Sequence, residues 1–233
     1  DADVFLDVVR GLGDRAREAG AGVVGGDLSA GEKLVISITA FGYCPGPVVR
    51  RDGACPGDLV AVSGTLGYSY AGLDLLEGGH VDPSARGEAQ LGDLAPFVDT
   101  YRAPRPPLGS GVAAAAAGAR AMMDLSDGPA TDAARIAKAS RVVIEFDREA
   151  IEAEASHLAP AARVCAVDPV RWVLQGGEEH GMIAVFPPDA ALPDGFRVVG
   201  VVRACLAEEE PRAMMDGAVL RGAWDHFSAD SVD

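Results

Sequence analysis

A layered α/β fold is predicted by the composition of the chain and by the way its apolar patterns change along the sequence. Hydrophobic residues make up 48% of the 233 residues and aromatic residues only 6%, so Ala, Val and Gly dominate the apolar set. Small side chains of this kind suit strands packed against helices. Period-two apolar runs and segments of helical periodicity succeed each other without a strict β-α-β order. Mixed sheets packed with helices, an α/β (α+β) class, are therefore expected.

The first 47 residues are expected to form one helix and two strands. Asp3 can cap a helix whose apolar residues recur at helical spacing as far as Leu12. Residues 23–24 are expected as a short strand that runs into a Gly-Gly-Asp turn. Residues 33–41 alternate between apolar and other side chains, which predicts a second strand with one face more buried.

A domain junction is predicted in the Pro- and Gly-rich segment 44–58, which divides the chain into domains 1–47 and 48–233. In the second domain, apolar runs bounded by Gly or polar residues predict strands, and a Pro at a first helical position marks two of the helices. The expected elements are strand 59–63, helix 67–76, helix 108–120, strand 121–125, helix 129–139, strand 142–146, a helix from Pro169 to about Leu174, strands 182–186 and 198–202, and a short strand near Met214.

The net charge of −15 argues against nucleic acid and anionic membrane surfaces as partners. An acidic protein that binds phosphates needs cations between itself and the ligand, and divalent metal held by Asp and Glu would supply them. The four cysteines have no zinc-site spacing, which favours reduced thiols in the cytoplasm. No segment is apolar enough over its length to suggest a membrane span.

The run 124–128, Asp-Leu-Ser-Asp-Gly, is the first candidate site. Asp124 is expected at a strand end and Asp127 at the cap of the following helix, so both carboxylates could bind a metal from one side. Ser126 adds a hydroxyl, and Gly128 lets the backbone come close to a ligand. The alternative is that Asp127 only caps the helix and Asp124 is solvated.

Two further glycine pairs precede acidic residues. Gly25-Gly26 leads into Asp27, and Gly176-Gly177 leads into Glu178, Glu179 and His180. Asp27 and Glu178 could each face a ligand that the glycines allow to come close. The first motif is equally consistent with an ordinary turn, and Gly176 with a helix C-cap.

Three other features have structural and functional interpretations. Arg51, in the junction loop, could pair with a nucleotide phosphate or be solvated. The turn 64–67 could hold a phosphate at a helix N-terminus, but it lacks the phosphate-loop pattern, so a structural turn is favoured. Trp224 could pack on the body of the fold or offer its ring to a flat or cationic ligand. Nothing indicates a catalytic triad, and no catalytic side chain is assigned.

The order of these motifs resembles the thiamine-monophosphate kinase family over nearly all of the chain. The matching segments, in order, are Gly-Gly-Asp at 25–27, Arg-x-Gly-Ala-x-Pro-Gly-Asp at 51–58, Ser-Gly-Thr-Leu-Gly at 63–67, Asp-Leu-Ser-Asp-Gly at 124–128, Gly-Gly-Glu at 176–178 and Asp-His-Phe at 225–227. The family belongs to a superfamily that includes aminoimidazole ribonucleotide synthetase and selenophosphate synthetase. The resemblance therefore implies a two-domain fold similar to aminoimidazole ribonucleotide synthetase.

The resemblance also implies ATP-dependent, Mg²⁺-assisted phosphorylation of thiamine monophosphate to thiamine diphosphate. Its implied partners are these small molecules and a second copy of the chain in a cytoplasmic homodimer. The implied Mg²⁺ ligands are Asp27, Asp124 and Asp127, the ATP contacts are Arg51 and Ser126, and the substrate contacts are Glu178 and Trp224.

Several positions depart from the family pattern. Leu28 and Ser29 follow the first motif where the family often has two Thr, Tyr68 stands where it often has Asp, and Glu179-His180 replaces Asp-Tyr. The N-terminal Gly-Asp-Asp and Lys-Ala-x-x-x-Asn-x-Ser-Asp segments are not in the chain, so the N-terminal ATP- and Mg²⁺-binding, dimer-forming domain is expected to be incomplete. Two alternatives stay open: another ATP-using enzyme of the superfamily, or a catalytically silent ligand- or partner-binding protein.

Overall fold

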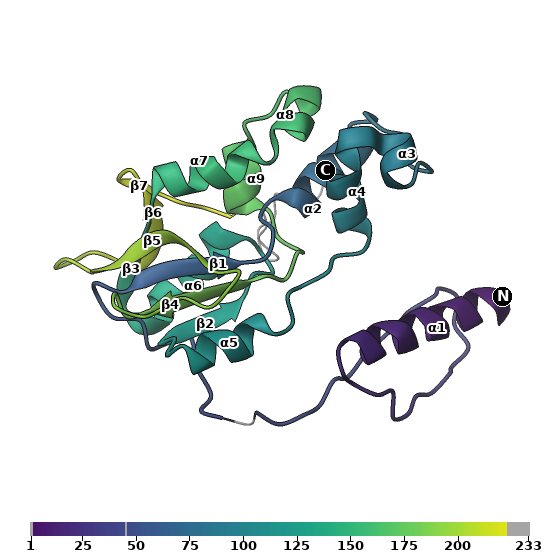
Figure 1. Ribbon diagram of the computed structural model, residues 1–233, viewed down its shortest axis with the longest axis horizontal. Helices are drawn as coiled ribbons and strands as arrows, with labels where there is room; N and C mark the ends of the chain where they lie inside the picture. The colour runs from purple at the N-terminus through teal and green to yellow at the C-terminus, as the bar shows by residue number, and fades with distance from the viewer. Residues whose placement is uncertain (1, 45, 223–233) are drawn as a thin grey trace. The chain divides into compact units, whose positions relative to one another are not determined.

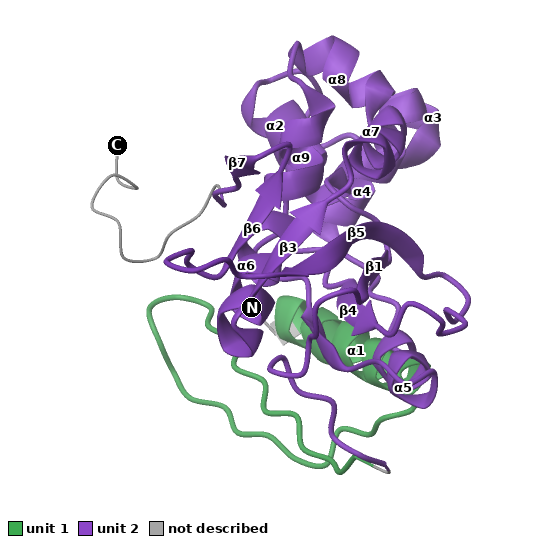
Figure 2. Ribbon diagram, turned by 90° about the vertical axis from the view of Figure 1, so that its left-hand side faces the viewer, with its two compact units in different colours: residues 1–45 green, residues 46–233 purple. Residues whose placement is uncertain are grey.

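The computed structural model describes residues 2–44 and 46–222. They fall into two compact units, residues 1–45 and residues 46–233, which Figure 2 colours separately. Trp224 lies outside the described residues. The predicted boundary between domains, after residue 47, stays a prediction.

Unit 1 contains the helix α1 (Ala2–Glu18), as the sequence predicts. Three ion pairs at i,i+3 spacing stabilise its surface: Arg10–Asp7 at 3.0 Å, Arg15–Glu18 at 2.6 Å and Arg17–Asp14 at 2.9 Å. Each pair is exposed, and such a pair stabilises a helix by only about 0.2–0.5 kcal/mol.

The two strands predicted for unit 1 are wrong, because residues 23–24 and 33–41 form no strand in the described part of this unit. Ile36 and Ile38, expected on the buried face, have exposed fractions of 54% and 66%. A strand is defined by hydrogen bonds to a neighbouring strand, and an alternating pattern alone does not provide that neighbour.

Unit 2 is built on a seven-stranded sheet within its described residues, with the strand order β2-β4-β1-β5-β3-β6-β7 (Figure 1). β3 pairs with β6 in parallel, and the other neighbouring pairs are antiparallel. The strands are β1 (Leu59–Ser63), β2 (Ala121–Asp124), β3 (Val142–Phe146), β4 (Met182–Phe186), β5 (Arg197–Ala204), β6 (Arg212–Met215) and β7 (Ala218–Val219). This mixed sheet confirms the predicted α/β (α+β) class, and six of the seven strands were predicted.

The helices of unit 2 connect and cover these strands. They are α2 (Tyr68–Glu77), α3 (Gly87–Leu91), the 3-10 helix η1 (Gly92–Leu94), α4 (Ala95–Arg102), α5 (Ser110–Ala116), α6 (Pro129–Ser140), α7 (Arg148–Ser156), α8 (Ala159–Cys165) and α9 (Pro169–Gln175). The sequence predicts α2, α5, α6 and α9 but not α3, α4, α7 or α8. The four missed helices have between 5 and 9 residues, too few to show a clear helical period.

The two faces of the sheet are covered differently. Val60 and Val62 of β1 belong to the large core beneath α2, α6, α7 and α9, whereas Ala61 faces a small cluster with Ala114 of α5. β4 alternates in the same way, with Val185 in the large core and Phe186 in the small cluster. Side chains alternate between the faces of a strand, so each apolar run serves both cores.

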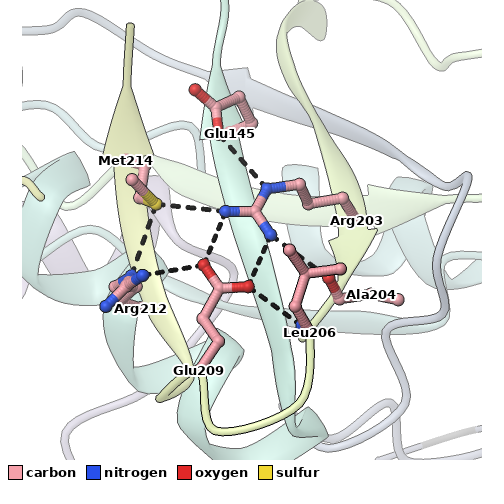
Figure 3. A network of polar contacts seen from close by, with 7 residues as sticks. All are labelled: Glu145, Arg203, Ala204, Leu206, Glu209, Arg212 and Met214. Carbon is pink, nitrogen blue, oxygen red and sulfur yellow. Dashed lines mark hydrogen bonds and ion pairs between the residues drawn. The ribbon is translucent and has the colours of Figure 1, made fainter. Parts of the chain in front are cut away.

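A network of charged side chains joins β5 to β6 across the intervening strand β3, in the half of the sheet far from β2 (Figure 3). Glu209 accepts hydrogen bonds from Arg203 at 2.7 Å and from Arg212 at 2.8 Å, and also from the backbone N–H of Leu206 at 3.0 Å. Arg203 lies 3.5 Å from Glu145 of β3. The Arg203 hydrogen bonds are the main cause that lowers the pKa of Glu209 to about 2.

We predict that Glu209→Gln lowers stability at neutral pH and weakens its dependence on acid. A lowered pKa means that the Glu209 contribution is present above the unfolded-state value of about 4.3 and is lost as pH falls towards 2. Urea unfolding at pH 7, 4 and 2.5 measures the difference between the two proteins. The difference should shrink towards pH 2.5, and a constant difference would contradict the prediction.

Candidate functional site

Two loops of unit 2 lie side by side where β2 ends and β4 begins. Asp124 of β2 pairs with Met182 of β4, so the loop 125–128 lies beside the loop 176–181. The backbone N–H of Glu178 donates to the carbonyl oxygen of Ser126 at 3.0 Å, and that of Leu125 donates to Gly181 at 2.9 Å. The sheet therefore brings together two motifs that are some 50 residues apart in the sequence.

Glycine is required where these loops touch. A Cβ at Gly177 would lie 2.1 Å from the carbonyl oxygen of Ser126, far inside contact distance. Gly128 has φ +92°, and its Cβ would lie 2.7 Å from the carbonyl oxygen of Gly176. The glycines of both motifs thus allow the backbones to approach each other, rather than only a ligand.

A pocket of about 600 Å³ opens beside the two loops. Ser126, Asp127, Gly177 and Glu178 form the loop side. The rest of the lining comes mainly from α2, with contributions from α4 and α9: Ser69, Tyr70, Leu73, Asp74, Glu77, Tyr101 and Gln175. Three residues predicted to bind ligands, Ser126, Asp127 and Glu178, therefore share one cavity.

Asp127 does not cap α6, contrary to the sequence-based expectation. The N-cap is Gly128, which has no side chain to donate or accept. The Asp127 carboxylate instead pairs with Arg135, which follows eight residues later in α6. It also lies 3.2 Å from the Ser126 hydroxyl. Arg135 also pairs with the buried Asp132 at 2.6 Å, and Asp132 accepts the backbone N–H of Asp127 at 3.0 Å.

Asp124 lies next to the pocket lining, at the end of β2. Its carboxylate is 3.5 Å from Nδ1 of His180, whose Nε2 is 3.9 Å from the Glu178 carboxylate. The Asp124 side chain is 58% exposed and that of Glu178 76% exposed, so both can meet a solvated ligand. His180 therefore lies between two predicted ligand-binding acids, a position that its sequence context did not indicate.

The turn 64–67 is structural, as the sequence analysis favoured. The α2 N-terminus that follows it is occupied by a carboxylate of the protein itself, because Glu179 accepts the backbone N–H of Ser69 at 3.0 Å. Gly67, at the N-cap, has φ +78° and provides no side-chain cap. Helix N-termini favour negative charge, and Glu179 meets that preference here.

Among the predicted site residues of unit 2 that the structure describes, Arg51 and Asp124 are not part of the pocket lining. The Arg51 carbonyl oxygen accepts a hydrogen bond from the Ser140 hydroxyl at 3.0 Å. Ser140 is the last residue of α6, so Arg51 lies at the opposite end of this helix from Asp127. Asp27 belongs to unit 1, a separate compact unit of the chain. Among residues 2–44 and 46–222, no group of three or more His, Cys, Asp or Glu could hold a metal ion. The metal and ATP roles of these residues stay predictions.

Sequence reasoning missed the α2 wall of the pocket and the Asp132–Arg135 pair. Five pocket residues of α2 fall at positions 69, 70, 73, 74 and 77, which share one helical face. A polar and aromatic stripe on a helix that is otherwise apolar was the available signal. Asp132 carried another signal in the sequence, because it stands in an Ala-rich helix three residues before an Arg. The structure shows that it is fully buried.

Comparison with known proteins places the chain in a family. No family model matches it. A thiamine-monophosphate kinase of Mycobacterium tuberculosis (strain H37Rv) is 38% identical over 223 residues, which cover 94% of this chain and 62% of the relative. The Corynebacterium glutamicum enzyme of that name is 40% identical over 197 residues, covering 84% and 57%. That of Halobacterium salinarum is 31% identical over 233 residues, covering 97% and 72%.

Solved structures agree in fold. The structure described as AaThiL complexed with AMPPCP and TMP matches with a TM-score of 0.62 and 26% identity, over 77% of this chain and 54% of that one. Hydrogenase maturation protein HypE matches with a TM-score of 0.61 at 18% identity, a likeness of fold alone. The chain spans about three fifths of the length of the first curated relatives, 62% for M. tuberculosis. With 31% identity over 72% of the H. salinarum protein, the chain belongs to the thiamine-monophosphate kinase family.

Proposed function

We propose that the protein transfers a phosphoryl group from ATP to thiamine monophosphate, giving thiamine diphosphate. The observation that carries this proposal is the convergence of Ser126, Asp127 and Glu178 on one pocket in a chain of this family. A relative's structure is described as complexed with AMPPCP and TMP, an ATP analogue and the proposed acceptor. The motifs that contain Ser126 and Glu178 resemble those of the family, and the ATP and substrate contacts are proposed at these two residues.

The charge of the pocket supports binding of the thiamine end of the substrate. Within the described part of the chain, its lining includes four carboxylates, from Asp74, Glu77, Asp127 and Glu178, and no Lys, Arg or His. Tyr70 and Tyr101 also line it. A cationic, flat thiazolium ring is attracted both by carboxylates and by aromatic faces. We assign this contact to Glu178, and to Trp224 at the C-terminus.

Asp124 and Asp127 fit a Mg²⁺ site in their donor chemistry, with Asp27 as a further ligand. Carboxylate and hydroxyl oxygens are the donors that Mg²⁺ prefers, and it usually binds one or two carboxylates together with substrate phosphates. Asp124 is well exposed and Asp127 lies on the pocket. Arg135 shares the Asp127 carboxylate, so it would hold that oxygen in place while the other face meets a cation.

The chemistry asks for positioning more than for a proton acceptor. The acceptor is a phosphate monoester that is already anionic near neutral pH, so no general base is assigned. Bound Mg²⁺ would supply the positive charge that screens two polyanions and orients them for in-line transfer. Ser126 would donate its hydroxyl to ATP, Arg51 would pair with a phosphate, and Glu178 would hold the acceptor.

The remaining assignments extend this proposal to the whole protein. Residues 1–47 would contribute to an N-terminal domain that binds ATP and Mg²⁺ and forms a homodimer. Residues 48–233 would form the second domain. None of the helices in the described residues is long and apolar enough to cross a membrane. We propose a cytoplasmic location, with the small molecules as ligands and no nucleic acid partner.

Asp124→Asn in the full-length protein tests the metal assignment. The substitution removes a charge while keeping shape, and we expect kcat/KM for thiamine diphosphate formation to fall by about 100-fold or more. Asp189→Asn, on the exposed turn after the opposite end of β4, is the matched control and should leave the rate unchanged. A rate near that of wild type for Asp124→Asn would exclude the metal role. Absence of product with the wild-type protein would exclude the proposed function.

A further inference from the structure

The loop that carries Glu178 has a strained backbone on both sides of Glu179. Glu178 has φ +72° and His180 has φ +52°, a region that residues other than Gly rarely adopt. Each such residue is strained and persists only where surrounding contacts hold it. Two of them within three residues therefore need a strong anchor.

Glu179 lies between them and has no role in the proposed chemistry. Glu179 is only 5% exposed, whereas the side chain of the preceding Glu178 is 76% exposed. The Glu179 carboxylate accepts the backbone N–H of Ser69 at 3.0 Å. Burial is the main cause that raises its pKa to about 7, and the backbone N–H groups of Ser69 and Tyr68 oppose that shift. A buried acid on a helix N-terminus is the expected anchor.

This contact connects the two walls of the pocket. Glu178 and Gly177 belong to the loop wall, and Ser69, Tyr70 and Asp74 belong to α2. The neighbouring contact on the other side is the hydrogen bond from the Glu178 backbone N–H to Ser126. The segment is therefore held on one side by the loop 125–128 and on the other by α2.

We propose that Glu179 is a positioning residue, which rests on the proposed function: its carboxylate fixes Glu178 in the left-handed conformation and sets the loop wall against α2. Without the Glu179 carboxylate to accept the Ser69 N–H, Glu178 would relax to ordinary backbone angles and turn away from the pocket. The substrate site would then widen, while Ser126, Asp124 and Asp127 would stay in place. The defect should appear as weaker binding of thiamine monophosphate rather than as a slower chemical step.

Three variants of the full-length protein separate positioning from bulk stability. Glu179→Ala removes the acceptor, and KM for thiamine monophosphate should rise about tenfold with a much smaller change in kcat. Glu179→Gln keeps an oxygen that can accept the Ser69 N–H, so KM should stay within about twofold of wild type. Glu209→Ala, in the distant β5–β6 network, is the control that lowers stability without changing KM.

Stability should respond differently from KM. A carboxyl whose folded pKa is raised to about 7 favours the folded state below the unfolded value of about 4.3 and loses that advantage as pH rises through 7. Glu179→Gln removes this loss, so its melting temperature at pH 8 should not fall below that of wild type. A purely structural role predicts instead that KM follows melting temperature in all three variants.

Hydrogen exchange followed by mass spectrometry tests the contact without any activity. In Glu179→Ala, amides of residues 176–181 and 67–72 should exchange about tenfold faster, with 143–146 unchanged. Unchanged exchange in both segments, or a KM increase no larger than in Glu209→Ala, would overturn the proposal. If the wild-type protein forms no thiamine diphosphate while Glu179→Ala still shows this faster exchange, the proposed function is overturned and the anchor is established.

Discussion

Gly177→Ala is expected to disrupt the pocket by separating its two loops. The new Cβ would lie 2.1 Å from the Ser126 carbonyl oxygen, 2.9 Å from its carbonyl carbon and 3.1 Å from the Cα of Asp127. All three are backbone atoms, so no side-chain rotation relieves the clash. We expect a loss of about 2–3 kcal/mol in the free energy of unfolding, at the upper end for overpacking.

The activity should fall more than the stability suggests. The displaced loop carries Glu178, and the loop 125–128 with which it clashes carries Ser126 and Asp127. Urea unfolding gives the free energy of unfolding. Titration with thiamine monophosphate gives its dissociation constant, which should rise about tenfold or more because a substrate contact is displaced.

Gly109→Ala is the matched control for this substitution. A Cβ added at Gly109 would have no atom within 4 Å, and the residue has ordinary helical angles, φ −79° and ψ −12°. Its replacement should change stability by no more than about 0.5 kcal/mol. If Gly177→Ala were equally neutral, the close approach of the two loops would be wrong.

Trp172→Ala is expected to have the largest effect on stability. Trp172 is fully buried in α9 and is the largest of the completely buried side chains in the described residues. Its backbone lies against Gly67, where even a Cβ would come within 2.8 Å of the Trp172 carbonyl carbon. Removing an aromatic side chain from such a core costs about 3–5 kcal/mol, which chemical denaturation can measure.

Trp172→Phe separates packing from hydrogen bonding. The Trp172 indole N–H donates to the Asp74 carboxylate at 2.7 Å, and Asp74 lines the pocket. Phenylalanine fills much of the space but donates nothing, so we expect about 1–2 kcal/mol of destabilisation and a measurable change in substrate KM. If Trp172→Phe left KM unchanged, Asp74 would not need this donor to serve the pocket.

The elements around the candidate site were the easiest to predict from sequence. Pro129 and Pro169 begin α6 and α9 as expected, and the apolar runs 59–63 and 182–186 match β1 and β4. These signals are local: proline fixes φ at a first helical turn, and an apolar run bounded by glycine indicates a buried strand. They placed the two motif loops at strand and helix ends, but not next to each other.

Partners in space were harder to predict. Asp127 has an ordinary capping sequence, yet it pairs with Arg135 because Gly128 takes the cap and turns the Asp127 carboxylate along α6. Residues 33–41 have an ordinary strand pattern, yet they form no strand because a ladder needs a second strand. Glu179 looked like a departure from the family motif, whereas it caps α2 from 110 residues away.

The sequence by itself determined the fold class, most strands of the sheet and the motifs that mark the family, because these depend on periodicity, on Gly and Pro, and on the order of residues along the chain. Only the tertiary structure decided that two glycine loops touch, that α2 supplies the acidic and aromatic wall, and that Glu179 rather than a ligand occupies a helix N-terminus. Those features depend on which strands neighbour each other, and strand neighbours are chosen by burial of the whole sheet rather than by any local pattern.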